Sequence, residues 1–342
     1  MAAVAFGATR RAPLFYGARR LSHIWRGPPL PPLPTGSLLS FLRSHGDWES
    51  MSDSPALTCS MTQTTLTYGG LLRRVDSAAS ALARTGFGAG SVLNLHLPNC
   101  AQYVVAFLAA TELGGVVTGS NPSYTASELS QQQRDSGAVA VLSTADLRET
   151  VVAAAEQSGV THVSFIEDAG CCFANSSEEV DGESALGRAS IDGPNQLMAL
   201  PYSSGTTGAP KGVMLTHQNL VANVLQNISD AELQYDVREG DRLIGVLPLY
   251  HIYGMLIMGC SLASRAHLVL MPKFSPEAFL ETMQAHRISG AFLVPPIILF
   301  LAKHPLVASC TGRPSSTHHG SYMHGSCMHA CVHLYWHAEL DP

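Results

Sequence analysis

Charge is scarce in this chain of 342 residues, because only 13% of them are Asp, Glu, Lys or Arg, against roughly 25% in a typical soluble domain. There are only three lysines, and the net charge is −6. A body that binds nucleic acid through a basic surface is therefore disfavoured, and so is a highly charged disordered protein. The 46% of hydrophobic residues is enough to bury a core, with room for more than one compact unit.

Long apolar runs and closely spaced cysteines are also missing. No stretch of ~18 apolar residues continues without a charged residue or a Pro or Gly break, so the sequence predicts no transmembrane helix. The eight cysteines are scattered along the chain and form no compact disulfide framework. This distribution favours a reducing compartment.

Acidic residues are absent from residues 1–46, which contain six arginines. An Arg-rich, acid-free stretch with interspersed apolar residues is typical of a mitochondrial transit peptide, and residues 28–34 resemble a stiff Pro-rich spacer. We therefore expect a leader and linker over residues 1–46 and a mitochondrial location. The alternatives are a leader that carries no address and a cytoplasmic or peroxisomal protein. Residues 47–308 form an acidic body, with 13 basic and 24 acidic side chains.

Apolar periodicity in this body alternates between helical and extended patterns. Helical spacing after Thr67 predicts a helix that ends near Gly86, and Ser275 followed by Pro276 predicts the start of another. The expected strands are 91–97, 138–142, 162–166, 197–200, 243–247, 268–270 and 291–294, and the expected helices include 101–113, 145–157, 216–228, 252–262 and 275–286. Strands separated by helices predict an α/β fold of mostly parallel sheets flanked by helices.

The most informative stretch is residues 202–213, with the sequence YSSGTTGAPKGV. Its glycines let backbone N–H groups approach an anion closely, and its hydroxyl side chains add donors. Lys211 supplies a mobile positive charge suited to phosphate oxygens. The stretch is not a Walker A loop, because Pro210 precedes the lysine and Gly212 follows it. A Gly- and Ser-rich surface turn could share this composition, but the complete pattern favours a phosphate-binding loop.

This stretch resembles the phosphate-loop signature of the acyl-adenylate-forming enzymes, which include acyl-CoA synthetases and 4-coumarate–CoA ligases. Residues 247–254 (LPLYHIYG) resemble a second motif of the 4-coumarate ligase branch, and residues 294–296 (VPP) resemble its next one. Similar residues occur upstream at 66–68, Asn99 and 121–125. The resemblance implies that residues 47–308 are a partial, incomplete AMP-binding (adenylation) N-terminal domain.

The resemblance further implies an ATP-dependent carboxylic acid–CoA ligase of the 4-coumarate or medium-chain acyl type. A small carboxylic acid would attack the α-phosphate of ATP, with Mg²⁺ bound, to form an acyl-adenylate. Coenzyme A, the second substrate, would then displace AMP through its thiol. The residues that would hold the phosphates are Ser203, Ser204, Gly205, Thr206, Thr207, Gly208 and Lys211.

Further roles are implied for single residues of the later motifs. Lys211 and His251 would be catalytic, and His251 would act as a gate near the reacting carboxylate unless it is a partly buried histidine that caps a strand end. Tyr253 and Ile257, one helical turn apart, would line the acyl pocket unless they are ordinary core residues. Lys273 would meet the phosphates of coenzyme A unless it is only a solvated surface lysine.

Two later parts of the family pattern are missing from this sequence. The aromatic-Gly and Thr-Glu motif, which would supply the Mg²⁺ ligand, does not occur after residue 300, and no lysine follows Lys303. Because the loss of one aimed donor costs ~10²–10³ in rate, we expect negligible ligase turnover by this chain alone. The alternative function is a catalytically inactive truncated form that binds nucleotide phosphate or acyl ligand, or that pairs with a full-length copy.

Residues 309–342 contain six histidines and three cysteines without periodicity. Histidine and cysteine are zinc ligands, but their spacing here does not match a standard zinc finger, so we predict no metal site. We expect a disordered tail that replaces the usual continuation of the family.

Overall fold

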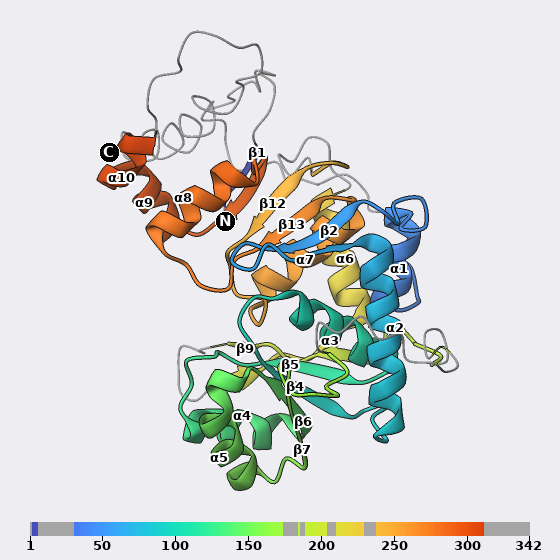
Figure 1. The fold of residues 1–342 in the computed structure, drawn as a ribbon. Coiled ribbons are helices and arrows are strands. Elements are labelled where there is room, and N and C mark those ends of the chain that lie inside the picture. Colours follow the sequence, from blue (N-terminus) through green and yellow to red (C-terminus); the bar gives the residue numbers. More distant parts are fainter. Residues whose placement is uncertain are drawn as a thin grey trace, which may run out of the picture.

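The computed structural model describes residues 2–5, 31–173, 184, 189–203, 210–228 and 237–310. In this part of the chain two six-stranded sheets lie one above the other, with helices between them and on their outer faces (Figure 1). The predicted α/β fold of mostly parallel sheets flanked by helices is confirmed. Most of the residues assigned to the leader, and the predicted tail beyond Cys310, lie outside the described residues.

The upper sheet of Figure 1 has the strand order β1–β14–β12–β13–β2–β3. Its four central strands run parallel, whereas β1 and β3 pair antiparallel at the two edges. In chain order the strands of this sheet are β1 (Ala2–Ala5), β2 (Pro55–Cys59), β3 (Thr65–Thr67), β12 (Arg242–Gly245), β13 (His267–Leu270) and β14 (Gly290–Leu293).

The lower sheet has the order β11–β8–β5–β4–β6–β7. All its strands run parallel except β11, which pairs antiparallel with β8 at one edge. The strands are β4 (Val92–His96), β5 (Val116–Gly119), β6 (Ala138–Ser143), β7 (His162–Phe165), β8 (Leu197–Ala199) and β11 (Leu215–Thr216). A separate two-stranded ladder is formed by β9 (Tyr202–Ser203) and β10 (Lys211–Gly212).

The helices divide into a central layer and two outer layers (Figure 1). Those described are α1 (Leu38–Gly46), α2 (Tyr68–Arg84), α3 (Ala101–Glu112), α4 (Ala126–Ser136), α5 (Arg148–Ser158), α6 (His217–Ile228), α7 (Ile252–Ala263), α8 (Pro276–Ala285), α9 (Pro295–Lys303) and α10 (Pro305–Cys310), with a 3₁₀ turn at Ala145–Leu147. Helices α3 and α7 are buried over nearly their whole lengths, which is typical of helices enclosed on all sides. No described helix has the length and hydropathy that crossing a membrane requires.

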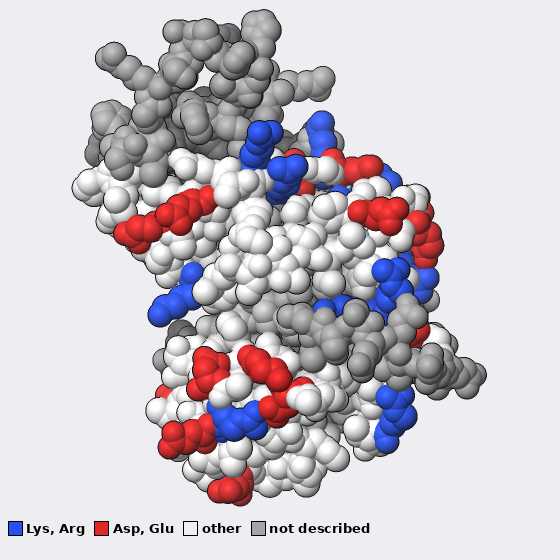
Figure 2. Space-filling view, viewed as in Figure 1, with Lys and Arg blue, Asp and Glu red and all other residues white. Residues whose placement is uncertain are grey.

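The surface charge follows the sparse composition. On the face shown in Figure 2, acidic and basic side chains lie in small separate groups, and uncharged atoms cover most of the described surface. A negatively charged ligand on this face would therefore depend on nearby donors rather than on a wide basic field.

Helix α1 lies within residues 1–46, where the sequence predicted only a leader and a linker. Its residues Leu38, Leu39 and Leu42 are at most 2% exposed and belong to the main core. The N-cap Ser37 accepts a hydrogen bond from the backbone N–H of Ser40 at 3.0 Å. The folded body therefore begins before Leu38, which corrects the boundary expected after residue 46. The Arg-rich part of the predicted leader, with the apolar residues that suggested a transit peptide, lies outside the described residues.

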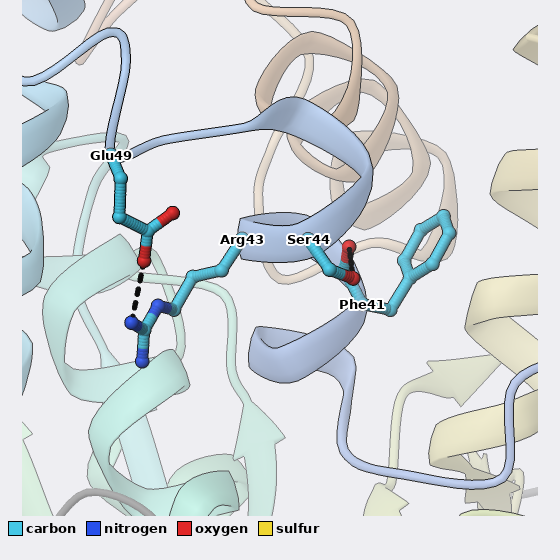
Figure 3. A network of polar contacts seen from close by, with 4 residues as sticks. All are labelled: Phe41, Arg43, Ser44 and Glu49. Atoms are coloured by element: carbon cyan, nitrogen blue, oxygen red, sulfur yellow. Dashed lines mark hydrogen bonds and ion pairs between the residues drawn. The ribbon is translucent and has the colours of Figure 1, made fainter.

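Polar contacts fix the end of α1 to the segment that follows it (Figure 3). Arg43 forms an ion pair with Glu49 at 2.7 Å, and the hydroxyl of Ser44 donates to the carbonyl of Phe41 at 3.2 Å. Further along, the indole N–H of Trp48 donates to the carbonyl of Leu262 at 3.1 Å. The exposed ion pair contributes little, whereas the buried indole bond attaches this region to the end of α7.

Two predicted helix starts are confirmed. The hydroxyl of Thr67 accepts from the N–H of Gly70 at 3.1 Å at the start of α2. The hydroxyl of Ser275 accepts from the N–H of Ala278 at 3.2 Å, and Pro276 lies in the first turn of α8. Both side chains satisfy N–H groups that the helix itself leaves unpaired.

Candidate functional site

The segments that the sequence motifs singled out lie at the carboxyl ends of parallel strands. They are residues 97–100 after β4, 120–125 after β5, 202–213 after β8, 246–251 after β12 and 271–275 after β13. In open α/β sheets, ligands bind outside the carboxyl ends of the strands. This edge of the two sheets is therefore the candidate site.

The β9–β10 ladder forms the base of the glycine-rich stretch. Ser203 pairs with Lys211 and Tyr202 pairs with Gly212, so the chain reverses direction between the two strands. The pairing brings the first and last of the predicted phosphate ligands side by side, and both side chains are exposed. The remaining predicted ligands lie outside the described residues, and their placement stays a prediction: Ser204, Gly205, Thr206, Thr207 and Gly208.

Tyr202 attaches this hairpin to the helix that covers the lower sheet. Its hydroxyl donates a hydrogen bond to the carboxylate of Asp135, near the end of α4. Burial and the neighbouring Asp135 raise the pKa of the Tyr202 hydroxyl, so it stays protonated and able to donate. A Cβ on Gly212 would stand 3.2 Å from the Tyr202 ring, so the glycine allows the ring to pack closely. The base of the hairpin is thereby fixed to the lower sheet.

The second motif connects β12 to α7 and carries His251. This residue is the N-cap of α7, and its Nδ1 accepts a hydrogen bond from the backbone N–H of Tyr253 at 3.2 Å. The side chain is exposed, and it caps the start of a helix rather than a strand end. With Nδ1 as the acceptor, the neutral ring carries its proton on Nε2. His251 therefore presents a donor at the carboxyl edge, and its role as a gate stays a prediction.

Glycines allow this motif to pack against both sheets. A Cβ on Gly254 would stand 2.0 Å from the carbonyl oxygen of Pro248, so α7 can lie against the preceding turn only because residue 254 has no side chain. At the end of β5, a Cβ on Gly119 would stand 2.6 Å from the Cβ of Tyr250. The segment between β12 and α7 is thus confined by the upper sheet that it leaves and the lower sheet that it touches.

Gly254→Ala is expected to lower the free energy of unfolding by about 2–3 kcal/mol, because the new methyl group would force a backbone carbonyl to move. The change is measured as the shift of the urea midpoint at constant m-value. The control is Gly88→Ala, since nothing lies within 4 Å of a Cβ at that position. Equal midpoints for the two variants would show that the backbone before α7 can shift to accommodate the methyl group at little cost in free energy.

The other predicted site residues lie in two different environments. Tyr253 is 8% exposed and Ile257 is 1% exposed, and both belong to the main core. The ring of Tyr253 meets Phe292 of β14 edge to face, with centroids 6.4 Å apart. These positions suit core packing, and the acyl-pocket role stays a prediction. Lys273 is exposed between β13 and α8, and its contact with coenzyme A also stays a prediction.

The pairing of Tyr202 with Asp135 was not predicted from the sequence. Tyr202 stood in the glycine-rich stretch without a role, and Asp135 lies 67 residues before it in the polar helix α4. No local pattern links two residues at that separation. The one local signal was the tyrosine itself. Turns usually carry small polar residues, so a tyrosine directly before the hydroxyl-rich stretch indicates a packing or hydrogen-bonding role.

A metal site is not formed by side chains within the described ranges. No three or more His, Cys, Asp or Glu residues come together there in a way that could hold a metal ion. The exposed charged or hydrogen-bonding side chains described at the carboxyl edge include those of Ser203, Lys211, His251 and Lys273.

Comparison with known proteins gives three findings. A family model described as AMP-binding enzyme matches residues 46–335 of the chain, and so extends into the predicted tail. The chain is similar to 4-coumarate–CoA ligase 3 of Arabidopsis thaliana, with 36% identity over 263 residues that cover 76% of this chain and 46% of that protein. The chain spans about half the length of the curated relatives it matches.

Solved structures share the fold. A long-chain-fatty-acid-CoA ligase (FadD1) from Archaeoglobus fulgidus matches with a TM-score of 0.73 and 23% identity, over 87% of this chain and 58% of that one. The N-terminal domain of FACL13 from Mycobacterium tuberculosis matches with a TM-score of 0.67 and 24% identity, over 80% of this chain and 66% of that one. At these identities the likeness concerns the fold alone.

Proposed function

Because the chain belongs to the AMP-binding enzyme family, we propose that it provides the phosphate-binding part of an ATP-dependent carboxylic acid–CoA ligase. The observation that carries this proposal is the β9–β10 ladder, which sets Ser203 beside Lys211 at the carboxyl edge of the lower sheet. The proposed acid is of the 4-coumarate or medium-chain acyl type, and the first of these alternatives agrees with the name of the similar 4-coumarate–CoA ligases. The proposed second substrate is coenzyme A.

In the proposed adenylation step the carboxylate of the acid attacks the α-phosphate of ATP, and pyrophosphate leaves. Catalysis of such a transfer depends mainly on positioning and on positive charge around the phosphates. The ammonium group of Lys211 neutralises part of the charge that builds on the departing pyrophosphate, and the hydroxyl of Ser203 donates to a phosphate oxygen. Within the described residues, no group of three or more His, Cys, Asp or Glu side chains could hold the Mg²⁺ that would accompany ATP.

His251 supplies the donor on the acid's side of this proposed site. Its Nε2–H is free of the capping bond that Nδ1 makes, and the ring is exposed at the carboxyl edge of the upper sheet. The ring would hold the carboxylate until adenylation and then turn aside for the thiol of coenzyme A. Lys273, on the loop after β13, would contact the phosphates of coenzyme A.

The second candidate is a chain that binds ATP or a carboxylic acid but does not turn over by itself. In that case activity would require pairing with a full-length copy.

The mitochondrial location is a further proposal, and it rests on the Arg-rich, acid-free first residues.

ATP–pyrophosphate exchange with a panel of aromatic and medium-chain acids separates the two candidates. Exchange above the acid-free blank with at least one acid is expected if the chain adenylates. Saturable ATP binding by calorimetry without exchange would support the binding-only candidate. Absence of both exchange and ATP binding would contradict the assignment of residues 202–213 to phosphate.

A further inference from the structure

The side chain of Asn99 joins the two sheets at their carboxyl edges. Its amide nitrogen donates to the carbonyls of Gly245 and Leu247 at 3.0 and 2.9 Å, and its Oδ1 accepts from the N–H of Leu249 at 2.9 Å. Asn99 follows β4 of the lower sheet, whereas all three partners lie at or after the end of β12 in the upper sheet. The partners are 146 to 150 residues away along the chain.

The bonds of Asn99 reach backbone groups around the end of β12, and one of these, the Gly245 carbonyl, also accepts from the N–H of Met271 at 3.1 Å. Asn99 is 6% exposed, so its partners face a side chain rather than bulk water. Buried backbone groups without partners are costly, and the amide of Asn99 gives a donor to the Leu247 carbonyl and an acceptor to the Leu249 N–H. Aspartate has the same shape but no N–H donors, and alanine has neither donors nor an acceptor.

The segment held in this way leads directly to His251. Leu249 is two residues before His251, and between them Tyr250 packs against Gly119 of the lower sheet. The hairpin with Lys211 follows β8, which also belongs to the lower sheet. The two halves of the candidate site thus come from different sheets, and Asn99 crosses between those sheets.

We propose that Asn99 is a positioning residue that holds residues 246–251, and through them His251, at a set distance from the hairpin that carries Lys211. Its effect on catalysis rests on the proposed function. Its effect on the backbone does not, because the hydrogen bonds to residues 245–249 exist without any substrate.

Asn94, on β4 itself, is a matched control. It is 0% exposed, and its amide nitrogen donates to the carbonyl of Thr118 and the hydroxyl of Ser120 at 3.0 and 3.1 Å. Its Oδ1 accepts from the side chain of Gln133 at 3.2 Å. Asn94 therefore makes as many bonds at greater burial, but its partners lie on β5, directly after β5 and on α4, and none lies in residues 245–251. Replacing it disturbs the core without touching residues 246–251.

The test compares Asn99→Ala with Asn94→Ala by hydrogen exchange in the full chain. After correction for global stability from urea unfolding, the Leu249 amide is expected to exchange at least about tenfold faster in Asn99→Ala, because its acceptor is gone. Asn94→Ala is expected to leave the corrected rate unchanged. An equal change at Leu249 in both variants would overturn the positioning role.

Asn99→Asp serves if Asn99→Ala does not fold. It keeps the size and an acceptor but loses both donors, so exchange in residues 246–251 is expected to rise above that of the wild type and of Asn94→Ala. No rise in exchange over these residues would count against the proposal.

A second readout is the pyrophosphate exchange rate. Asn99→Ala is expected to lower kcat for the acid about tenfold or more, with the KM for ATP nearly unchanged, because Lys211 is held by the β9–β10 ladder and not by residues 246–251. A higher KM for ATP with an unchanged kcat would contradict the proposal. If the wild-type chain itself shows no exchange, the proposed function fails, and hydrogen exchange at Leu249 still decides the role of Asn99.

Discussion

Replacing Lys211 by alanine is expected to weaken ATP binding by about tenfold to a hundredfold. Hydrogen bonds to charged groups contribute about 1.5–3 kcal/mol each, and Lys211 is the one lysine in the glycine-rich stretch of a chain that has three in total. Where pyrophosphate exchange is measurable, the rate is expected to fall by about 10²–10³, as for the loss of other aimed donors. Calorimetric titration with ATP and the exchange assay measure the two effects.

Two further variants make the Lys211 result specific. Lys303→Ala removes another of the three lysines, at the end of α9 and away from the hairpin, and is expected to bind ATP as the wild type does. Lys211→Arg keeps the charge but changes its shape, so it is expected to retain part of the affinity. Unchanged binding and exchange in Lys211→Ala would remove the phosphate role of this stretch.

Acidification from pH 6.5 to pH 4 is expected to cost the fold several kcal/mol of stability. Burial lowers the pKa of His96, His217 and His267 from 6.5 to about 4, and nearby Arg242 and His286 add to the effect at His267. In the unfolded chain these rings take up protons below about pH 6.5, whereas the folded protein resists protonation until about pH 4. The unfolded state therefore binds more protons throughout this window, and stability is lost as the pH falls through it.

Urea unfolding at a series of pH values between 7.5 and 4 measures this loss. Each unit of pKa shift corresponds to about 1.4 kcal/mol, so His96→Asn is expected to flatten the pH dependence by roughly a third. The exposed His162 is the control, and His162→Gln is expected to leave the slope unchanged. A stability that does not change between pH 6.5 and 4 would show that these rings are protonated in the folded state at little cost.

The elements that sequence patterns predicted are those with strong local signals. The helix starts at Thr67 and Ser275 depend on bonds to backbone groups three residues away, so they are visible in a short window. Helix α4 was not predicted, because its polar surface has little apolar periodicity, although a capping box of Thr125 and Glu128 begins it. Strand β5 was not predicted either, because its sequence VVTG has only two apolar residues before a threonine and a glycine.

The candidate site was predicted in its parts and not in its assembly. Residues 202–213 and 247–254 were singled out by motif, and the structure places both at carboxyl ends of strands. Residues 202–213 follow β8, which belongs to the lower sheet, whereas residues 247–254 follow β12, which belongs to the upper sheet. Strand order is set by packing between distant segments, and no motif contains it.

The sequence by itself determined the α/β alternation, the helix starts and the phosphate-loop signature, because each depends on residues close together along the chain. Only the tertiary structure decided that α1 belongs to the core, that Tyr202 meets Asp135 and that Asn99 crosses from one sheet to the other. The physical reason is that a buried hydrogen bond depends on where folding brings its partner. Partners 67 to 150 residues apart leave no periodicity or spacing from which the contact could be inferred.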